Sequence, residues 1–553
     1  MLMGKKRATL ADAVAQHVRA GDVLHPVVGH TRWSAATREV VRQWWGRDPQ
    51  FTLVMLSLSS LGALFFRGKL VRKVITGYSG DTFPNFTPNP WFARAYESGE
   101  VDVEHWSFLA FAQRLEAAAR NLPAIVTRSI AGSSMEVNDA YARVGTPFGE
   151  IGLLAPLQPD VAIMHAPIAD HWGNVAIHPP LLEGVWGALA AKRGAIVTVE
   201  RIVDDIRTWS HLVRLPAHRV LAVVECPMGA HPGGLYTGDI PVDGYGEDYE
   251  FWIDARAATR GSADEYDAWI KRWVLDVETQ EQWLEQVGAE RIEFLRAKAQ
   301  GAEVTTPLDT ESPANAWELA AVFGARHLAA RVAATSAKAV LAGAGVANLA
   351  AWLGVQIARE RGCEVELTAE IGLWGYEATF GDPFVLNHGN FPSARMLSDA
   401  TTVLGALVGG NGTKTIGCLG AAQIDRFGNI NSTHIVPRPF LVGSGGGNDV
   451  ASMALENVVV ATLTPQRTVA DCSYITSPGT HVQALVTDLA TFEKDGDEFV
   501  LTALAPGATV EQVDALVGWD LRVANDVAEL EAPHEGEVVA LRVWDPNGWF
   551  LRS

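Results

Sequence analysis

Short runs of Val, Ile and Leu alternate with longer Ala-rich amphipathic segments along most of the chain. Such apolar runs are typical of buried parallel strands, and apolar residues that recur every three to four positions are typical of helices. The pattern therefore predicts an α/β fold in which helices cover mainly parallel sheets. Residues 236–300 combine helical apolar spacing with many Trp, Tyr and acidic residues, which predicts a helical extension after the first half.

The order of elements and motifs recurs in two halves. An apolar run ends in Asp-x-x-Gly-Asn at Asp170, in PDVAIMHAPIADHWGN, and again at Asp425, in CLGAAQIDRFGN. Near the start of each half, a helical stretch, a β-like run, a glycine (Gly29 or Gly345) and another helix follow one another. The repeat predicts two related halves, with extra sequence between residues 77 and 147 of the first.

A polar segment, GAEVTTPLDTESP at 301–313, has few apolar residues and two prolines, which is typical of a linker. It divides the chain into a first domain at 1–300, whose residues 236–300 are the helical extension, and a second domain at 314–553. Fusion of two once-separate subunits explains this division.

Composition and charge exclude several classes of protein. The chain has 553 residues, 48% of them hydrophobic, with 44 basic and 64 acidic side chains and a net charge of −20. The length exceeds the needs of one core, and intrinsic disorder is excluded. Acidic charge is spread along the chain without a long basic stretch, so we expect no nucleic-acid partner.

One uncharged stretch, residues 339–358, has the length of a bilayer-spanning helix. Gly343, Gly345 and Asn348 within it predict a strand, a turn and a buried helix, so we expect no membrane segment. The amino terminus lacks the pattern of a secretory signal, and the four cysteines lack disulfide or metal spacing. These features favour a cytoplasmic location and no bound metal.

Three motifs of the second half are candidates for chemistry. Glu370 follows the strand-like run CEVEL, and a carboxylate at the end of a strand in an α/β sheet can act as a nucleophile or base; the alternative is a solvated turn residue. GSGGGND at 443–449 precedes a predicted helix, where backbone N–H groups can hold an anion; the alternative is a flexible turn. Gln423 stands where the first half has Ile168, so the fold does not require its amide.

At these residues the sequence resembles the class I CoA-transferases of the glutaconate CoA-transferase type, with the α and β subunits joined in one chain. The first half resembles the α subunit in GDVLHPVVGHTRW, NLPAIVTRSIAGS, PDVAIMHA and PMGAHPGGLY. The second half resembles the β subunit in the three motifs above, in SYITSPGTHV and in GWDLRVANDVAELEAP. The resemblance implies the CoA-transferase fold, with the catalytic glutamate in the second domain.

The resemblance also implies a ping-pong mechanism. Glu370, followed by Ile371 where the family usually has serine, attacks an acyl-CoA to form an anhydride and then a glutamyl-CoA thioester. Gln423 and the backbone N–H groups of Gly445 and Gly446 are then the expected oxyanion donors, each worth roughly 3 kcal/mol in the transition state. The partners are an acyl-CoA and a free carboxylic acid; CoA is a substrate, and no cofactor is expected.

Substrate-binding candidates follow from the same resemblance. Tyr78 and Ser79 of GYSGD, with Asn387 and His388, are expected to line the acyl pocket. Arg32 lies in a Val-Gly-His-Thr-Arg turn, where the family has a Gly-Gly-Phe-type turn, and is a candidate carboxylate ligand or a surface ion-pair partner. The resemblance further implies a homo-oligomer of the fused chain.

Two alternatives remain open. A hydrolase of the same fold, including those that open rings of CoA thioesters in steroid breakdown, dispenses with the nucleophilic glutamate, and an acid of the first half such as Glu104 would act instead. A non-catalytic acyl-CoA-binding protein would use Glu370 only as a turn residue. The presence of Glu370 favours transfer.

Overall fold

The computed structural model describes residues 6–29, 33–301, 307–410 and 412–552. The chain forms two compact units: unit 1 contains Met1–Val126 and Leu153–Glu303, and unit 2 contains Thr127–Gly152 and Val304–Ser553. The passage after Glu303 falls inside the predicted linker at 301–313. The inclusion of Thr127–Gly152 in unit 2 departs from the contiguous domains 1–300 and 314–553, because hydrogen bonds to distant parts of the chain hold this segment there.

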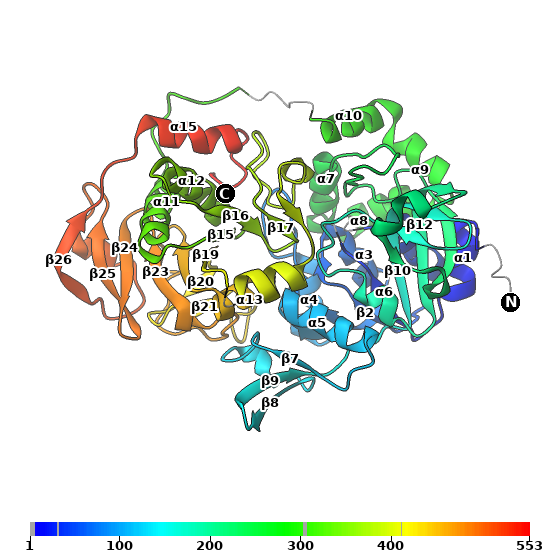
Figure 1. Cartoon of the computed structure of the whole chain (residues 1–553), viewed down its shortest axis with the longest axis horizontal. Helices are drawn as coiled ribbons and strands as arrows, with labels where there is room; N and C mark the ends of the chain where they lie inside the picture. The colour runs from blue at the N-terminus through cyan, green and yellow to red at the C-terminus, as the bar shows by residue number, and fades with distance from the viewer. Residues whose placement is uncertain (1–5, 30–32, 302–306, 411, 553) are drawn as a thin grey trace. The chain divides into compact units, whose positions relative to one another are not determined.

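Unit 1 is built on a nine-stranded sheet with the order β13-β11-β10-β1-β2-β4-β6, in which β12 pairs with β10 and β14. Figure 1 labels β2, β10 and β12 of this sheet. Its central strands are parallel, and the short β11 is antiparallel to both of its neighbours, β10 and β13. The strands are β1 (Val23–Pro26), β2 (Phe51–Val54), β4 (Val71–Thr76), β6 (Asp102–His105), β10 (Val161–Asp170), β11 (Val175–Ala176), β12 (Gly194–Val203), β13 (Val213–Leu215) and β14 (Val220–Glu225), with a separate pair β3 (Ser57–Leu58) and β5 (Tyr78–Ser79).

The helices of unit 1 include the predicted helical extension. They are α1 (Leu10–His17), α2 (Ala35–Trp44), α3 (Ala63–Arg67), α4 (Pro90–Ser98), α5 (Phe108–Ala119), α6 (Trp186–Ala190), α7 (Tyr249–Arg260), α8 (Ala263–Ile270), α9 (Gln280–Val287) and α10 (Ala289–Ala299). The extension is helical from Tyr249 onward, and the residues between 236 and Tyr249 contain turns and isolated bridges.

Unit 2 is built on a ten-stranded sheet with the order β18-β17-β16-β15-β19-β22-β23-β24-β25-β26. The strands are β15 (Ala339–Ala342), β16 (Glu366–Ala369), β17 (Leu373–Trp374), β18 (Met396–Leu397), β19 (Thr415–Leu419), β22 (Glu456–Val460), β23 (Val482–Val486), β24 (Ala490–Asp495), β25 (Glu498–Leu504) and β26 (Val523–Glu529). Five neighbouring strands of this sheet, β16, β15, β19, β22 and β23, are parallel, so their carboxyl ends lie at one edge of the sheet.

Helices α11 (Ala316–Thr335) and α12 (Val346–Glu360) pack on this sheet, as does α13 (Gly447–Met453). The remaining helices are α14 (Val510–Asp514) and α15 (Glu535–Trp544). A hairpin of β20 (Gln423–Ile424) and β21 (Ile430–Asn431) follows β19, and β7 (Ile125–Thr127), β8 (Tyr141–Thr146) and β9 (Gly149–Leu154) form a small sheet in the order β7-β9-β8.

The two units repeat the same β-α plan, which confirms the internal repeat. In each unit, the first strand (β1 or β15) is followed in the chain by a helix and then by a second strand (β2 or β16), which pairs with the first strand on one side. A later strand (β10 or β19) pairs with the first strand on its other side. This reversal of strand order is a topological switch point, where α/β sheets collect ligands at the carboxyl ends of strands. Gly29 and Gly345 both lie in the turn after the first strand, as predicted.

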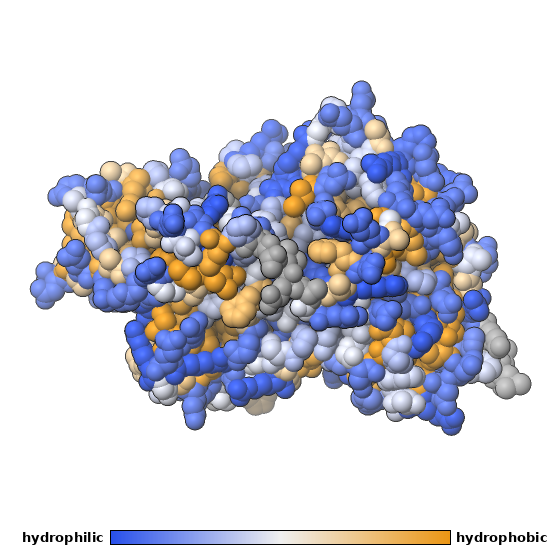
Figure 2. Space-filling model, turned by 90° about the horizontal axis from the view of Figure 1, so that it is seen from above, coloured by the Kyte–Doolittle hydropathy of each residue, from blue (hydrophilic) through white to orange (hydrophobic). Residues whose placement is uncertain are grey.

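The uncharged stretch at 339–358 consists of β15, a turn and most of α12. The two long helices pack closely, since a Cβ at Gly354 of α12 would lie 3.0 Å from the carbonyl oxygen of Ala325 in α11. None of the helices in the described part of the chain combines the length and apolar character that a bilayer-spanning helix requires. On the face drawn in Figure 2, hydrophilic residues cover most of the surface and hydrophobic residues occupy separate areas.

Candidate active site

Glu370 is the first residue of a tight turn between two antiparallel strands. Ala369 of β16 pairs with Leu373 of β17, which leaves Glu370, Ile371 and Gly372 as a three-residue turn. Gly372 has a φ of +112°, and a Cβ there would lie 2.4 Å from the carbonyl oxygen of Ser398. Only glycine allows this close approach of the chain to itself. The turn fixes Glu370 at the carboxyl end of β16.

The glycine loop before α13 lies directly against the Glu370 carboxyl group. The backbone N–H of Gly446 donates a hydrogen bond to Glu370. A Cβ at position 446 would lie 1.7 Å from Glu370 Oε2, so the carboxyl oxygen occupies the space that a side chain would fill. Gly445, with a φ of +55°, supplies the left-handed residue that brings the loop into this position. The structure thus brings together Glu370 and Gly446, two of the predicted catalytic residues.

The surroundings of Glu370 disfavour its ionised form. Burial raises the pKa of Glu370 to about 8, the negative charge of Asp449 contributes to the rise, and the hydrogen bond from Gly446 opposes both effects. Although the side chain retains some solvent exposure, its carboxyl group is packed against the loop. A carboxylate with a raised pKa is a more basic nucleophile, and shifted values of this kind are typical of functional groups.

Asp449 itself is completely buried, and a segment from the first half of the sequence covers it. Ser129 Oγ donates a hydrogen bond to Asp449 Oδ1 at 2.6 Å. The neighbouring Asn448 accepts from the backbone N–H of Ile130 at 2.9 Å and donates to the carbonyl oxygen of Thr476 at 2.9 Å. Ile130 has a φ of +78°, which is rare for a β-branched residue, so this contact holds a strained backbone.

Sequence reasoning missed both residues of this pair. Asp449 stands in the GSGGGND motif, and its spacing of three residues from Gly446 was a usable signal, because residues three apart share a face of a helix. Ser129 lies 320 positions away from Asp449, and no local pattern connects them.

Gln423 lies in the β20–β21 hairpin, which follows the carboxyl end of β19. Its Oε1 accepts a hydrogen bond from Asn431 Nδ2 at 3.0 Å, and its Nε2 reaches the carbonyl oxygen of Gln466 only at 3.5 Å. Asn431 Oδ1 accepts from the backbone N–H groups of Thr433 and His434 at 3.1 and 3.2 Å, so the Asn431 amide has one orientation. Asn431 therefore sets the orientation of the Gln423 amide, with the oxygen turned toward Asn431.

The predicted substrate-binding residues have these positions. Tyr78 and Ser79 are buried in unit 1, where the Tyr78 hydroxyl donates to the carbonyl oxygen of Asp81 at 2.7 Å and Ser79 Oγ lies 3.0 Å from the Tyr96 hydroxyl. Asn387 and His388 belong to unit 2. Asn387 is buried and accepts from the Gly389 N–H at 2.9 Å, and the His388 ring lies 4.8 Å from that of Phe391. Arg32 lies outside the described residues.

A family model decides the affiliation of the chain. The model described as Coenzyme A transferase matches residues 7–226 and 398–515. The chain belongs to the coenzyme A transferase family. This confirms the predicted affiliation of the enzyme, and the matched regions contain Ser79, Gln423 and the glycine loop.

The chain is similar to the separate subunits of known members. It is 32% identical over 282 residues to one subunit of the 3-oxoadipate CoA-transferase of Pseudomonas knackmussii, covering 48% of this chain and 92% of that subunit. It is 38% identical over 148 residues to the other subunit of the same enzyme, covering 23% of this chain and 57% of that subunit. A cholesterol ring-cleaving hydrolase IpdA subunit of Rhodococcus jostii is 29% identical over 48% of this chain and 96% of the subunit.

Among solved structures, the acyl-CoA transferase YdiF of Escherichia coli O157:H7 has a TM-score of 0.66 at 16% identity, covering 98% of this chain and 96% of YdiF. At this identity the likeness concerns the fold, and it confirms the CoA-transferase-like α/β arrangement with two related halves.

Glu104, the acid expected to act in a hydrolase of this family, has an environment unlike that of Glu370. It lies in β6 and forms ion pairs with Lys73 at 2.8 Å and Arg114 at 2.7 Å. Burial alone would raise the pKa of Glu104, but the hydrogen bond from Lys73 and the charge of Arg114 outweigh it, and the pKa is lowered. Glu104 is therefore a paired anion.

In unit 1, the turn after β1 is also held by a buried acid. Glu183 accepts hydrogen bonds from the backbone N–H groups of Val28 at 2.6 Å and Gly29 at 2.9 Å. Burial raises the pKa of Glu183 to about 7 against the effect of these bonds. No motif of the sequence marks Glu183, which fixes the start of the turn at the switch point of unit 1.

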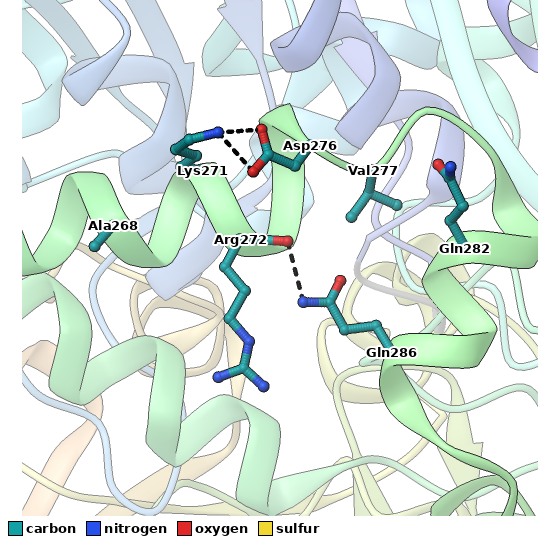
Figure 3. A pocket seen from close by; sticks show the side chains of 7 residues that line it. All are labelled: Ala268, Lys271, Arg272, Asp276, Val277, Gln282 and Gln286. Carbon is teal, nitrogen blue, oxygen red and sulfur yellow. Dashed lines mark hydrogen bonds and ion pairs between the residues drawn. The ribbon is translucent and has the colours of Figure 1, made fainter.

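A surface cavity of about 490 Å³ lies in the helical extension of unit 1, and Figure 3 shows its lining. Gln286 Nε2 donates to the carbonyl oxygen of Arg272 at 3.1 Å, and Lys271 is paired with Asp276. None of the candidate catalytic residues lines it. Within the described residues, no cluster of three or more His, Cys, Asp or Glu side chains is arranged to hold a metal ion.

Proposed function

We propose that the protein is a CoA-transferase that moves CoA between an acyl-CoA and a free carboxylic acid, with Glu370 as the nucleophile. The observation that carries the proposal is the packing of the Glu370 carboxyl group against Gly446, in surroundings that raise the pKa of Glu370 to about 8. Family membership supports the same chemistry, since the two subunits of a 3-oxoadipate CoA-transferase both match this chain.

The reaction consists of two exchanges. The ionised Glu370 attacks the thioester carbonyl, the carbon–sulfur bond breaks, and a mixed anhydride and a CoA thiolate form. The thiolate attacks the glutamyl carbonyl of the anhydride, which releases the first acid and leaves a glutamyl-CoA thioester. The acceptor carboxylate reverses both steps and departs as the new acyl-CoA. One carboxylate enters and one leaves, so charge balances and no oxidant is required.

Each step passes through a tetrahedral intermediate with a negative oxygen. The Gly446 N–H, which donates to the Glu370 carboxyl group, is placed to hold this oxygen when the glutamyl carbonyl is attacked. Gln423 is the proposed side-chain donor. Its amide oxygen already accepts a hydrogen bond from Asn431, whereas its amide nitrogen makes only a long contact of 3.5 Å with the carbonyl oxygen of Gln466. Oxyanion donors of this kind contribute roughly 3 kcal/mol each to transition-state binding.

The same observations weigh against the two alternatives. A hydrolase that relies on Glu104 needs an acid or base that can change its protonation state, whereas Glu104 is paired with Lys73 and Arg114. A binding protein has no need for a glutamate packed into the space of a missing Cβ at Gly446.

Trapping of the covalent intermediate tests the proposal. The protein is incubated with acyl-CoA thioesters, including 3-oxoadipyl-CoA because of the matched subunits. Its intact mass is measured before treatment with borohydride or hydroxylamine, and the mass of the Glu370 peptide is measured after it. In the wild type we expect a CoA adduct before treatment and, with CoA released, the alcohol or the hydroxamate of Glu370 after it; Glu370→Gln should show neither. Because the attacking form is ionised, the rate of adduct formation should rise with pH and level off above about 8. Turnover retained in Glu370→Gln would contradict the mechanism.

A further inference from the structure

We propose that Asp449, held in place by Ser129, is a positioning residue that drives Glu370 from its free carboxylate into its covalent forms by like-charge repulsion. The inference rests on the proposed function, because it concerns the same glutamate. Asp449 is assigned no contact with substrate and acts only through Glu370.

The first support is the way in which Asp449 is held. It is fully buried, and the Ser129 hydroxyl donates to its Oδ1 at 2.6 Å, an arrangement in which the carboxylate is the acceptor. The adjacent Asn448 binds the Ile130 N–H at 2.9 Å and the Thr476 carbonyl oxygen at 2.9 Å, which fixes the backbone on both sides of the contact. Hydrogen bonds donated to a carboxylate favour its ionised form.

The second support is the position of Asp449 relative to Glu370. Gly446 lies against the Glu370 carboxyl group, and residue 449 comes three positions later, on the same face of the first turn of α13. Burial raises the pKa of Glu370 most, and the charge of Asp449 raises it further. Two carboxylates therefore share one buried region, where like charges interact more strongly than in water.

Other elements packed on α13 contribute few charges. The segment that supplies Ser129 and Ile130 contributes Arg128, whose guanidinium donates to the carbonyl oxygen of Gly409 at 2.7 Å. The helical segment Thr401–Val408 has no charge, and β19 contributes Cys418, whose thiol pKa is raised by burial. β22 contributes Glu456, which is paired with Arg331 at 2.7 Å. His481 lies in the turn before β23, and burial lowers its pKa. Asp449 is thus the charged neighbour that acts on Glu370 in the described part of this region.

The chemical consequence follows from the charge change on acylation. Glu370 is an anion before reaction and is neutral as an anhydride or a CoA thioester. Repulsion from Asp449 raises the free energy of the anion and leaves that of the neutral thioester almost unchanged. The charge therefore shifts the equilibrium between acyl-CoA and glutamyl-CoA toward the covalent form.

Asp449→Asn tests the inference, because it removes the charge and keeps the size and an acceptor for Ser129. Two quantities are measured: the fraction of glutamyl-CoA at a fixed ratio of acyl-CoA to acid above pH 8, and the pH midpoint of adduct formation. We expect the fraction to fall about tenfold and the midpoint to move to lower pH by about one unit, since one pKa unit corresponds to a tenfold ratio. An unchanged midpoint and an unchanged fraction would overturn the inference.

Two serine variants complete the experiment. Ser129→Ala removes the donor to Asp449 and should move the midpoint in the same direction by a smaller amount. Ser134→Ala is the matched control, because Ser134 Oγ accepts from the Ile475 N–H at 2.9 Å in the same segment; it should leave the midpoint unchanged. If Asp449→Asn does not fold, the inference is tested by the pH midpoints of the two serine variants: a shift in Ser129→Ala but not in Ser134→Ala supports it, and equal midpoints overturn it. Absence of any adduct in the wild type would overturn the proposed function, and this inference with it.

Discussion

At the scale of single residues, the site depends on one missing side chain. Gly446 has a φ of −83°, which any residue can adopt, so its backbone conformation does not require glycine. What requires glycine is the Glu370 carboxyl oxygen, which would lie 1.7 Å from a Cβ at this position. Residue 446 is therefore a glycine because any side chain there would overlap the Glu370 carboxyl group.

Gly446→Ala should therefore damage catalysis more than stability. The added methyl group displaces the Glu370 carboxyl group from the Gly446 N–H, and we expect the rate of adduct formation to fall about hundredfold or more, the range seen when an oxyanion donor is lost. The rate is measured by rapid quench and mass spectrometry, and folding by thermal denaturation.

Gly447→Ala is its matched control. A Cβ at 447 would meet Ser477 Oγ at 3.6 Å, an ordinary contact, so this variant should keep an adduct rate close to that of the wild type. Equal rates of adduct formation in the two alanine variants would show that catalysis does not depend on the absence of a side chain at position 446.

At the scale of elements, the β20–β21 hairpin orients the Gln423 amide. Gln423 and Asn431 face each other across the two strands, and their side chains are joined at 3.0 Å. Two backbone N–H groups from the turn that follows fix the Asn431 oxygen. The hairpin therefore decides which end of the Gln423 amide is left for other partners.

Asn431→Asp should reverse this orientation. An aspartate keeps an oxygen for the Thr433 and His434 N–H groups but offers a second acceptor to Gln423, whose Nε2 then turns toward it. If Gln423 is an oxyanion donor, kcat should fall about hundredfold, and Gln423→Ala should add little to the loss in the double variant because both changes remove the same donor. If the losses in kcat measured by steady-state kinetics are additive, Asn431 does not act through Gln423, and the prediction is wrong.

At the scale of the whole molecule, the two units do not correspond to two continuous stretches of the sequence. Thr127–Gly152 is continuous with unit 1 in the chain on both sides, yet it belongs to unit 2, where Ser129, Ile130 and Ser134 make hydrogen bonds. The two halves are therefore joined by more than the linker at 301–313.

Cleavage of the linker should leave the two fragments associated. With a protease site inserted within residues 301–313, the amino-terminal fragment still contains Thr127–Gly152, which packs in unit 2. We expect the fragments to elute together in size-exclusion chromatography after cleavage. Asn448→Ala, which removes the partners of Ile130 and Thr476, should weaken the association. Separation of the wild-type fragments into two peaks would contradict the role of the segment.

Much of the architecture was available from local patterns. The Asp-x-x-Gly-Asn repeat marks a turn in each half, since Asp170 and Asp425 each accept hydrogen bonds from N–H groups of their own motif. Glu370 was predicted at the end of a strand, and Gly446 before a helix, because both depend on short-range periodicity and turn chemistry. At Gly372, the chain itself makes the close approach that requires a glycine, through the carbonyl oxygen of Ser398.

The sequence by itself determined the α/β class, the two related halves, the helical extension and the candidate nucleophile, because strand runs, helical spacing and glycine turns are local properties. Only the tertiary structure decided that Thr127–Gly152 joins unit 2, that Ser129 holds Asp449, and that Glu104 is ion-paired while Glu370 packs against Gly446. These features depend on contacts between residues far apart in the chain. The burial and charge that such contacts create set the pKa of a carboxyl group, and no local pattern encodes them.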